Sequence, residues 1–307
     1  MECFLLGSGG MVPLPGRRLS SMALRLDGRT FLFDCGEGTQ IPYKEARLGV
    51  RSLDVVAVTH HHADHVLGLP GMLMLRAQML DPPPLTVLGP PNIGRFIQNV
   101  RDDLGIYINY PIRFVAWSDG ADSLAYEDER VRIFWRLLDH TAPCIGYRFE
   151  ERDRPGRFDP AAATRLGVPK GPLWGELQAG RPVEGAQSPV TPDQVLGPAR
   201  RGRQVAYVTD TSPTESLEWL LEGVDLAFLE GMYGPEEAED AAGKKHLTVV
   251  QAASAARHAK ARDVVLIHIS PRYEDADMVR LEDVARQHHS SVRVGRDGQV
   301  FAIAMPE

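Results

Sequence analysis

Short apolar runs recur along the whole chain, and each is followed by polar or turn-forming residues. Several of the runs are continuously apolar instead of alternating, which is typical of strands that are covered on both faces. The pattern predicts strands at 4–7, 30–34, 54–59, 85–89, 131–139, 204–209, 224–230, 264–270, 292–295 and 299–305.

Helical periodicity is found between these runs, over roughly 68–79, 92–104, 213–222, 249–261 and 276–288. The helix after His246 has the clearest start signal, because Thr248 and Gln251 form a capping box ahead of an alanine-rich run. The alternation of strands and helices predicts an α/β protein. We expect one domain over residues 1–307.

One long segment departs from this pattern. Residues 150–203 hold eight of the 23 prolines and eight of the 29 glycines, with only weak helical content near 159–166. A long stretch without strong elements is uncommon inside a compact domain and is more often a functional protrusion. We therefore interpret 150–203 as an insertion within the single domain.

Composition excludes several classes of protein. With 307 residues, 43% of them hydrophobic, the chain can bury a sizeable core. No apolar run approaches the roughly 18 residues that a membrane span needs. Three cysteines without C-x-x-C spacing predict neither a disulfide framework nor a cysteine zinc site, and a reducing cytoplasm is the expected location. The sequence GSGG at 7–10 lacks the last glycine of a dinucleotide-binding loop, so no nucleotide cofactor is expected.

The net charge of −7 by itself argues against a nucleic-acid partner, but the charge is unevenly distributed along the chain. Residues 148–203 carry ten Lys and Arg against seven Asp and Glu, a local net charge of +3. This mild asymmetry decides nothing about partners by itself.

The densest chemical signal is VTHHHADHVLGLP at 58–70. It places His60, His62, Asp64 and His65 directly after an apolar strand, in the form H-x-H-x-D-H. The carboxyl ends of strands are where open α/β sheets place their ligand sites. Imidazole and carboxylate groups suit a divalent metal, with zinc the usual choice and manganese an alternative.

Three more candidate ligands lie at the ends of other apolar runs, namely His140, Asp210 and His268. Together with the first four they make seven ligands, enough for two metal ions that share one carboxylate. Two such ions, roughly 3.5–4 Å apart, clamp the attacking and leaving oxygens of a phosphoester and generate a hydroxide nucleophile near neutral pH.

H-x-H-x-D-H followed by a distant His, Asp and His resembles the metallo-β-lactamase superfamily. The resemblance implies an αββα sandwich, in which two mixed sheets are flanked by helices, but it does not fix the substrate. Finer motifs resemble the ribonuclease Z family: FDCGEGTQ at 33–40, GYRFEERDRPGRFD at 146–159 and KHLTVVQAA at 245–253. This resemblance implies a zinc-dependent endoribonuclease that cleaves the 3′ trailer from precursor tRNA after the discriminator and leaves a 3′-hydroxyl on the tRNA.

The resemblance also implies residue roles. Two zinc ions per subunit would be held by His60, His62 and His140 on one side and by Asp64, His65 and His268 on the other, with Asp210 bridging. Asp64 would also handle the proton of the bridging water. His246 would assist the leaving oxygen, and Glu230, at the end of the run 224–230, is our candidate for the carboxylate that orients it.

In the ribonuclease Z family the segment equivalent to 150–203 is a flexible arm that grips the tRNA. Lys170, Gly171 and Pro172 match the motif near its tip, and Arg152, Arg154 and Arg157 are candidate phosphate contacts. Arg17 and Arg18, in a loop expected near the metals, are candidates for holding the phosphates beside the scissile bond. The resemblance further implies a homodimer in which the arm of one subunit serves the site of its partner.

The chain departs from the family in two places. It has His246-Leu247-Thr248 where His-Ser-Thr is common, and 231–245 differs from many members. Two alternatives stay open: a phosphodiesterase of the same superfamily that acts on a small phosphodiester, and a relative that binds tRNA but is inactive.

Overall fold

The computed structural model describes residues 1–117 and 124–306. The chain divides into two compact units, which we describe separately. The larger unit combines Met1–Glu150 with Gln204–Ala304, and the smaller groups Glu151–Arg203 with the last residues of the chain, Met305–Glu307. Within the described residues, no helix is both long enough and apolar enough to cross a membrane.

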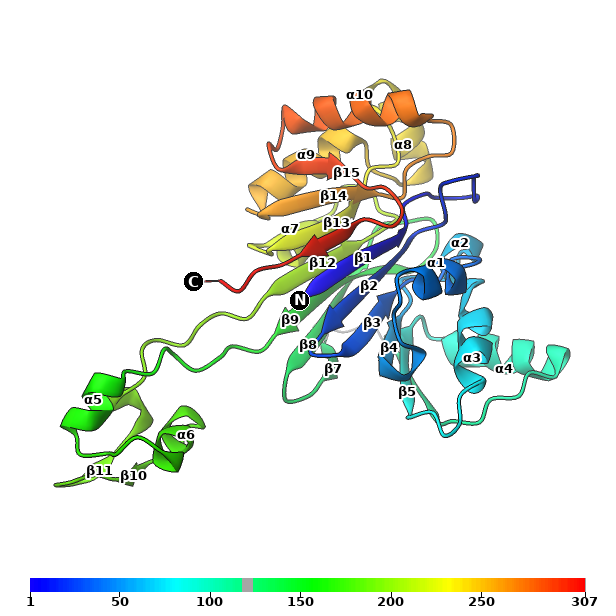
Figure 1. Ribbon diagram of the computed structural model, residues 1–307. Coiled ribbons are helices and arrows are strands. Elements are labelled where there is room, and N and C mark those ends of the chain that lie inside the picture. Colours follow the sequence, from blue (N-terminus) through cyan, green and yellow to red (C-terminus); the bar gives the residue numbers. More distant parts are fainter. Residues whose placement is uncertain (118–123, 307) are drawn as a thin grey trace. The chain divides into compact units, whose positions relative to one another are not determined.

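The larger unit contains two seven-stranded sheets (Figure 1). In the first, neighbouring strands are antiparallel from β16 to β3 and parallel from β3 to β6. Its order is β16 (Val300–Ala302), β1 (Glu2–Gly7), β2 (Ser21–Leu26), β3 (Arg29–Phe33), β4 (Leu53–Ala57), β5 (Leu85–Gly89) and β6 (Ile112–Ala116).

The second sheet is also mixed, because β12 to β15 run parallel while β9 pairs antiparallel with β12 and β7 with β8. Its order is β15 (Val292–Val294), β14 (Asp263–Ile267), β13 (Leu226–Glu230), β12 (Gln204–Val208), β9 (Cys144–Glu151), β8 (Val131–Leu138) and β7 (Leu124–Glu127).

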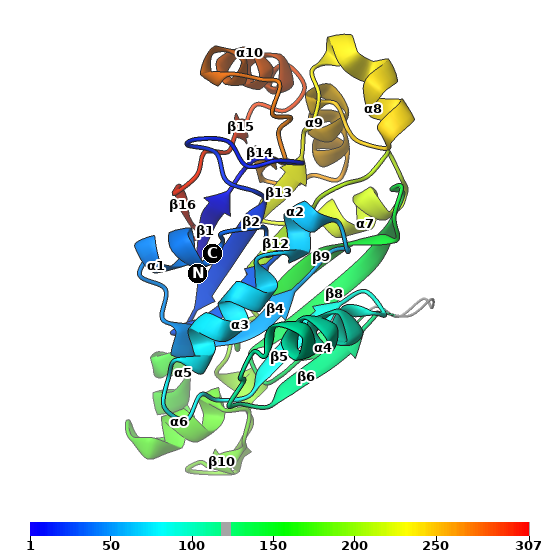
Figure 2. The same ribbon diagram turned by 90° about the vertical axis from the view of Figure 1, so that its right-hand side faces the viewer.

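Helices cover the outer face of each sheet (Figures 1 and 2). The first sheet packs under α1 (Gln40–Glu45), α3 (Leu69–Ala77) and α4 (Ile93–Leu104). The second packs under α7 (Ser216–Leu221), α9 (Val249–His258) and α10 (Asp275–Arg286). The remaining elements of this unit are short: η1 (Val50–Ser52), α2 (Ala63–Val66), η3 (Pro235–Glu237) and α8 (Ala238–Lys244). The predicted αββα sandwich is confirmed.

Strands are apolar on both faces because each sheet packs against two cores, one between the sheets and one under its covering helices. Leu5 of β1 points into a cluster between the sheets, whereas its neighbours Phe4 and Leu6 pack under the helices. The cluster between the sheets is rich in aromatic side chains, and the rings of Phe31 and Phe149, one from each sheet, meet edge to face with centroids 5.0 Å apart. The continuously apolar runs therefore mark double-sided burial.

Each predicted helix is present, with its ends shifted by a few residues. Within the described part of the larger unit, four strands were not predicted: β2, β6, β7 and β9. β6 and β7 are edge strands with mostly exposed or half-buried side chains, so they carry little apolar signal. β9 is interrupted by charged residues, whose charges are paired in the fold: Arg148 Nε lies 2.9 Å from Glu150 Oε1.

The smaller unit has more structure than the weak helix predicted near 159–166. That helix is present as α5 (Pro160–Arg165), capped by the side chain of Asp159. It is followed by α6 (Pro172–Gln178), the hairpin of β10 (Val183–Glu184) and β11 (Pro189–Val190), and η2 (Pro192–Gln194). These elements enclose a small apolar core that includes Ala163, Leu177 and Val190. The apolar residues are too scattered along 151–203 to show this core in the sequence.

A buried ion pair closes the base of the smaller unit. Glu151 and Arg203 are both almost fully buried, and the guanidinium contacts both carboxylate oxygens, at 2.8 and 3.1 Å. The backbone N–H of Glu151 also donates to the carbonyl of Arg203. The two ends of the segment are therefore hydrogen-bonded neighbours.

Packing between the sheets makes a direct stability prediction. Phe149→Ala removes a fully buried ring from the inter-sheet core, and we expect the free energy of unfolding to fall by about 3–5 kcal/mol. Leu80→Ala, at a side chain that is 90% exposed, is the matched control and should change it by less than about 0.5 kcal/mol. Urea unfolding of both variants measures the difference, and equal losses would contradict this description of the core.

Candidate metal centre

All seven predicted ligands follow the carboxyl ends of strands. His60 and His62 lie in the extended segment after β4, and Asp64 and His65 lie in the short helix α2 that follows. The other three come from the second sheet, in the turns after β8, β12 and β14 respectively: His140, Asp210 and His268. Both sheets therefore contribute to one edge of the sandwich.

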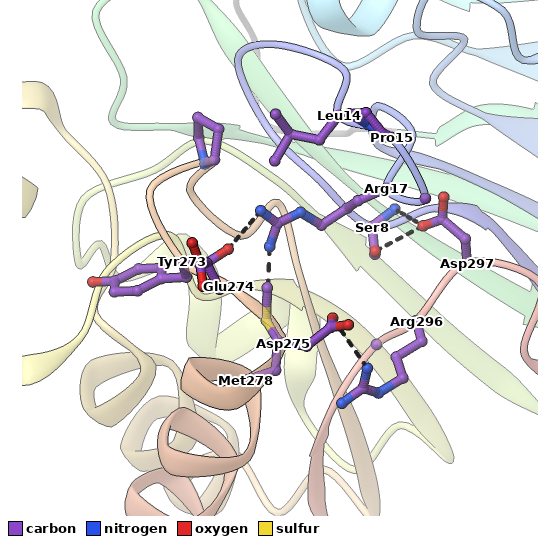
Figure 3. A pocket seen from close by; sticks show the side chains of 13 residues that line it. Ser8, Leu14, Pro15, Arg17, Tyr273, Glu274, Asp275, Met278, Arg296 and Asp297 are labelled. Carbon is purple, nitrogen blue, oxygen red and sulfur yellow. Dashed lines mark hydrogen bonds and ion pairs between the residues drawn. The ribbon is translucent and has the colours of Figure 1, made fainter.

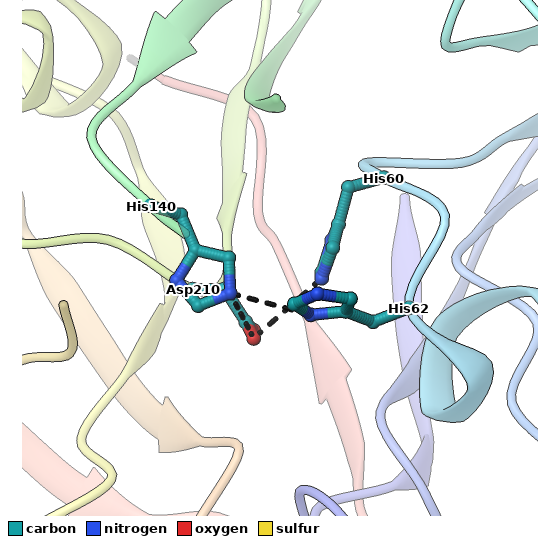
Figure 4. A group of neighbouring side chains, drawn as sticks. All are labelled: His60, His62, His140 and Asp210. Atoms are coloured by element: carbon teal, nitrogen blue, oxygen red, sulfur yellow. Dashed lines mark hydrogen bonds and ion pairs between the residues drawn. The ribbon is translucent and has the colours of Figure 1, made fainter. Parts of the chain in front are cut away.

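The first group of side chains is His60, His62, His140 and Asp210, whose ligand atoms all lie within 4.8 Å of one another (Figure 4). His140 Nε2 and His62 Nδ1 are 3.3 Å apart. The second group is Asp64, His65 and His268, gathered within the same limit. His65 Nε2 and His268 Nε2 are also 3.3 Å apart.

Asp210 lies between the two groups and turns one oxygen toward each. Its Oδ2 is 3.6 Å from His60 Nε2 and 3.5 Å from His140 Nε2. Its Oδ1 is 3.3 Å from His65 Nε2 and 3.2 Å from His268 Nε2. Asp210 and His268 both have positive φ, 28° and 57°, a backbone conformation that non-glycine residues rarely adopt and that is concentrated at functional sites.

The chemistry of this donor set fits a divalent metal. His60 Nε2 and Asp210 Oδ1 are buried and, among the described residues, have no partner placed to hydrogen-bond with them. Burial, assisted by the neighbouring His65, lowers the pKa of His60 well below its ordinary value and keeps the imidazole neutral, as a ligand must be. Imidazole nitrogens that meet at 3.3 Å repel or share a proton unless a cation lies among them. Buried His and Asp groups of this kind are typical of a metal site.

Burial opposes the negative charge of Asp64, but hydrogen bonds from His268 and His65 outweigh it and hold the pKa of this carboxyl well below its usual range. A further donor reaches Asp64 from the loop after β1, where the backbone N–H of Met11 lies 2.7 Å from Oδ2. The carboxylate is therefore ionised and fixed in orientation.

In three of the histidines, the ring nitrogen that faces away from the centre contacts a residue that the sequence did not identify. Asp34 Oδ2 lies 2.7 Å from His65 Nδ1, Thr59 Oγ1 lies 3.0 Å from His60 Nδ1, and the carbonyl of Lys245 lies 3.1 Å from His140 Nδ1. Such partners set the tautomer and ring orientation of a ligating histidine. A signal for Asp34 was present, because it ends an apolar run just as the predicted ligands do.

His246 and Glu230, predicted to act together, are in contact. His246 Nδ1 lies 3.0 Å from Glu230 Oε2, and Oε1 of the same carboxyl accepts the backbone N–H of Thr211. Complete burial, reinforced by the charge of Asp210, raises the pKa of Glu230 well above its ordinary value, and burial lowers the pKa of His246. His246 precedes α9, whose predicted capping box of Thr248 and Gln251 is present.

A ring nitrogen of His246 also lies within 4.8 Å of ligand atoms of Asp210 and His268, so His246 borders the candidate metal centre directly. Because Nδ1 is engaged by Glu230, Nε2 is the ring nitrogen left for another partner.

The predicted phosphate-binding residues lie in two places. Arg17 and Arg18 are on the loop after β1: Arg17 Nη2 donates to the carbonyl of Tyr273 at 2.8 Å, and Arg18 pairs with Glu45 at 3.1 Å. The others belong to the smaller unit, where Lys170 is exposed just before α6. The remaining members of that set are Gly171, Pro172, Arg152, Arg154 and Arg157.

Two family models match the chain: residues 15–76 match the metallo-beta-lactamase superfamily, and residues 181–269 match a beta-lactamase superfamily domain. Among solved structures, human tRNase Z, short form, superposes with a TM-score of 0.73 at 22% identity, covering 99% of this chain and 100% of that one. A diphosphatase from the PhnP family superposes at 0.62 with 19% identity, covering 98% and 96%. At these identities the likeness concerns the fold.

Whole-length relatives decide the family. Ribonuclease Z of Treponema pallidum is 45% identical over 308 residues, covering 100% of this chain and 99% of the relative. Ribonuclease Z of Treponema denticola is 43% identical, covering 97% and 96%. At this identity and coverage, and with the His and Asp groups gathered as the motif predicted, the chain belongs to the ribonuclease Z family of the metallo-β-lactamase superfamily.

Proposed function

We propose that the protein is a cytoplasmic, metal-dependent endoribonuclease that removes the 3′ trailer from precursor tRNA. It cuts after the discriminator and leaves a 3′-hydroxyl on the tRNA. The observation that carries this proposal is the pair of ligand groups joined through Asp210, in a chain related over its whole length to ribonuclease Z. Two joined groups suit the in-line cleavage of a phosphodiester.

The ligand set supports two zinc ions per subunit, with manganese as the alternative. His60, His62 and His140 would hold one ion, Asp64, His65 and His268 the other, and Asp210 both. When bound, the ions supply Lewis-acid polarisation of the scissile phosphodiester and lower the pKa of coordinated water.

The chain's own residues then hold and move protons. Asp64 is ionised and oriented by the N–H of Met11, so its carboxylate can accept a proton from attacking water. The raised pKa of Glu230 keeps its carboxyl protonated, so it can donate to His246 Nδ1 and leave the ring proton on Nε2. Nε2 can then give its proton to the leaving 3′ oxygen while Nδ1 takes up the proton of Glu230. The complete burial of Glu230 excludes water from this contact.

The smaller unit is proposed to bind the body of the tRNA, as an arm that positions the substrate. Its candidate contacts are Lys170, Gly171 and Pro172 near α6, with Arg152, Arg154 and Arg157. Phosphate contacts of this kind position RNA without reading its sequence. Arg17 and Arg18 are proposed to hold the phosphates beside the scissile bond, for which each must exchange its present partner, the Tyr273 carbonyl or Glu45.

A phosphodiesterase for small substrates is the second candidate, and the fold it shares with a diphosphatase favours it. A relative that binds tRNA without cleaving it is the third, and the complete ligand set argues against it. One experiment separates all three.

The test compares wild type, Asp210→Ala and an arm deletion on 3′-extended precursor tRNA and on bis(p-nitrophenyl) phosphate. Deleting 152–200 leaves Arg201-Gly202 between the hydrogen-bonded neighbours Glu151 and Arg203, the length of a two-residue hairpin. Adding Arg201→Asn gives the Asn-Gly pair that such turns favour. We expect the deletion to abolish tRNA processing and spare the small ester, and Asp210→Ala to lose both.

If zinc-loaded wild type hydrolyses the small ester but leaves precursor tRNA intact, the endoribonuclease proposal is wrong. Tight tRNA binding without cleavage of either substrate would instead identify the inactive relative. Retained zinc content in the arm deletion is the control that its metal centre is intact.

A double-mutant cycle tests the pairing of Glu230 with His246. His246→Ala should lower kcat roughly 10²- to 10⁴-fold. Glu230→Gln, which keeps the shape of the side chain, should lower it roughly 10- to 100-fold in wild type but add little in the His246→Ala background. KM and zinc content should stay unchanged. Fully additive losses of kcat would show that Glu230 does not act through His246.

The homodimer is proposed from the family relationship and from apolar side chains left exposed on adjacent helices. Ile41 of α1 and Met74 of α3 are 54% and 45% exposed, although α1 and α3 pack together. We expect twice the monomer mass in sedimentation equilibrium and a shift toward monomer in Ile41→Glu with Met74→Glu. Leu80→Glu, at an exposed residue outside these helices, is the control. A monomeric wild type would refute the dimer.

A further inference from the structure

Residues 8–18, in the loop between β1 and β2, contact the proposed metal centre at their inner side. The backbone N–H of Met11 donates to Asp64 Oδ2 at 2.7 Å, and Met11 adopts a left-handed φ of 67° to do so. The next residue inward, Gly10, lies against His268: a Cβ at Gly10 would come within 2.6 Å of His268 Nε2. The path of this loop therefore affects two proposed ligands.

Packing does not hold the tip of the loop. A cavity of about 450 Å³ separates residues 14–17 from the segments that face them, 271–278 and 295–297 (Figure 3). Arg17 reaches from the loop to the carbonyl of Tyr273 and to Met278 Sδ. Because the space between these walls is open, the loop is held mainly by hydrogen bonds, including those between its inner residues Ser8 and Gly10 and the backbone of Ile269.

One carboxylate, Asp297, ties both ends of the loop. At one end it accepts the backbone N–H and the hydroxyl of Ser8, at 2.9 and 2.8 Å. At the other end it accepts the backbone N–H of Arg18 at 2.6 Å. Both carboxylate oxygens are used, so Asp297 joins the two ends of residues 8–18, beside the backbone hydrogen bond from the Gly9 N–H to the carbonyl of Arg18 at 2.9 Å.

Asp297 is itself fixed by both sheets, because it lies in the turn between β15 of the second sheet and β16 of the first. The N–H of Gly295 donates to the carbonyl of Leu266 on β14, and that of Gly298 donates to the carbonyl of Leu5 on β1, both at 2.8 Å. A Cβ at Gly295 would lie 2.5 Å from Leu5 Cδ2, which shows how closely the turn is seated.

We propose that Asp297 is a positioning residue for the metal centre. By fixing the base of the loop to both sheets, it keeps the Met11 N–H on Asp64 and so holds that carboxylate toward His65 and His268. Partners that orient a ligating carboxylate commonly change metal affinity by roughly 10- to 100-fold. The inference rests on the metal centre proposed above and extends it to a residue that contacts none of the ligands.

The experiment titrates the full-length, metal-free protein with Zn²⁺ against a chromophoric chelator, without RNA. Asp297→Ala removes all three hydrogen bonds and should raise the Kd of the weaker zinc step roughly tenfold or more. Asp297→Asn keeps one oxygen that can accept from Ser8 and turns its amide donor toward the backbone N–H of Arg18, so it should give a smaller rise in the same direction. Amide hydrogen exchange of the peptide containing Met11 should become faster in both, while the thermal unfolding midpoint of Asp297→Asn stays near that of wild type.

Asp275→Ala is the matched control, since its carboxylate lines the same cavity but is 97% exposed and pairs with Arg296. Its zinc affinity should equal that of wild type. The proposal is overturned if folded Asp297→Asn binds zinc as tightly as wild type, or if Asp275→Ala weakens binding equally. If zinc affinity falls as expected but wild type does not cleave precursor tRNA, the positioning role stands and the proposed function fails.

Discussion

The carboxylate of Asp210 is the interaction on which the rest of the site depends. It is almost fully buried, and each of its oxygens faces two imidazoles. A buried carboxylate without partners is strongly unfavourable, so the position is tenable only because positive or metal-coordinating groups converge on it. In turn, it joins two ligand groups that would otherwise be separate.

That convergence depends on the distance between the two sheets. The H-x-H-x-D-H segment follows β4 of the first sheet, whereas His140, Asp210 and His268 follow strands of the second. Aromatic rings fill the space between: Phe33 meets Tyr147 and Tyr207 with centroids 5.8 and 5.7 Å apart. Because protein interiors are close-packed, these rings set the separation of the sheets and therefore the positions of the ligands.

Around the ligands, a set of polar partners removes the remaining freedom. Asp34 and Thr59 hold His65 and His60, and Glu230 holds His246. Among the partners Asp34 has a φ of 52°, and among the ligands His268 has a φ of 57°, backbone angles that non-glycine residues rarely adopt. The extensive cores on both faces of each sheet supply the stability that makes such local strain tolerable.

The sequence by itself determined what is encoded locally. Four ligands within six residues identified the metal chemistry, and apolar runs ending in His or Asp located the other three. The alternation of strands and helices predicted an α/β protein, and the resemblance of the motifs to a known superfamily implied the sandwich. Glu230 was a candidate partner for His246 because it ends a predicted strand, and the fold brings the two into contact. These features can be recognised in the sequence because the residues involved lie within a few positions of each other or occur each time at the end of an apolar run.

Tertiary structure alone decided the pairings between distant residues. Hydrophobic periodicity in the sequence shows little or nothing of three features: edge strands such as β6, the small core of 151–203, and the contact of Asp34 with His65. The same holds for Asp297, whose partner Ser8 is 289 residues away. Hydrophobic periodicity records which face of an element is buried but not which distant residue meets it, and hydrogen bonds of this kind form only when two sheets and their turns come together.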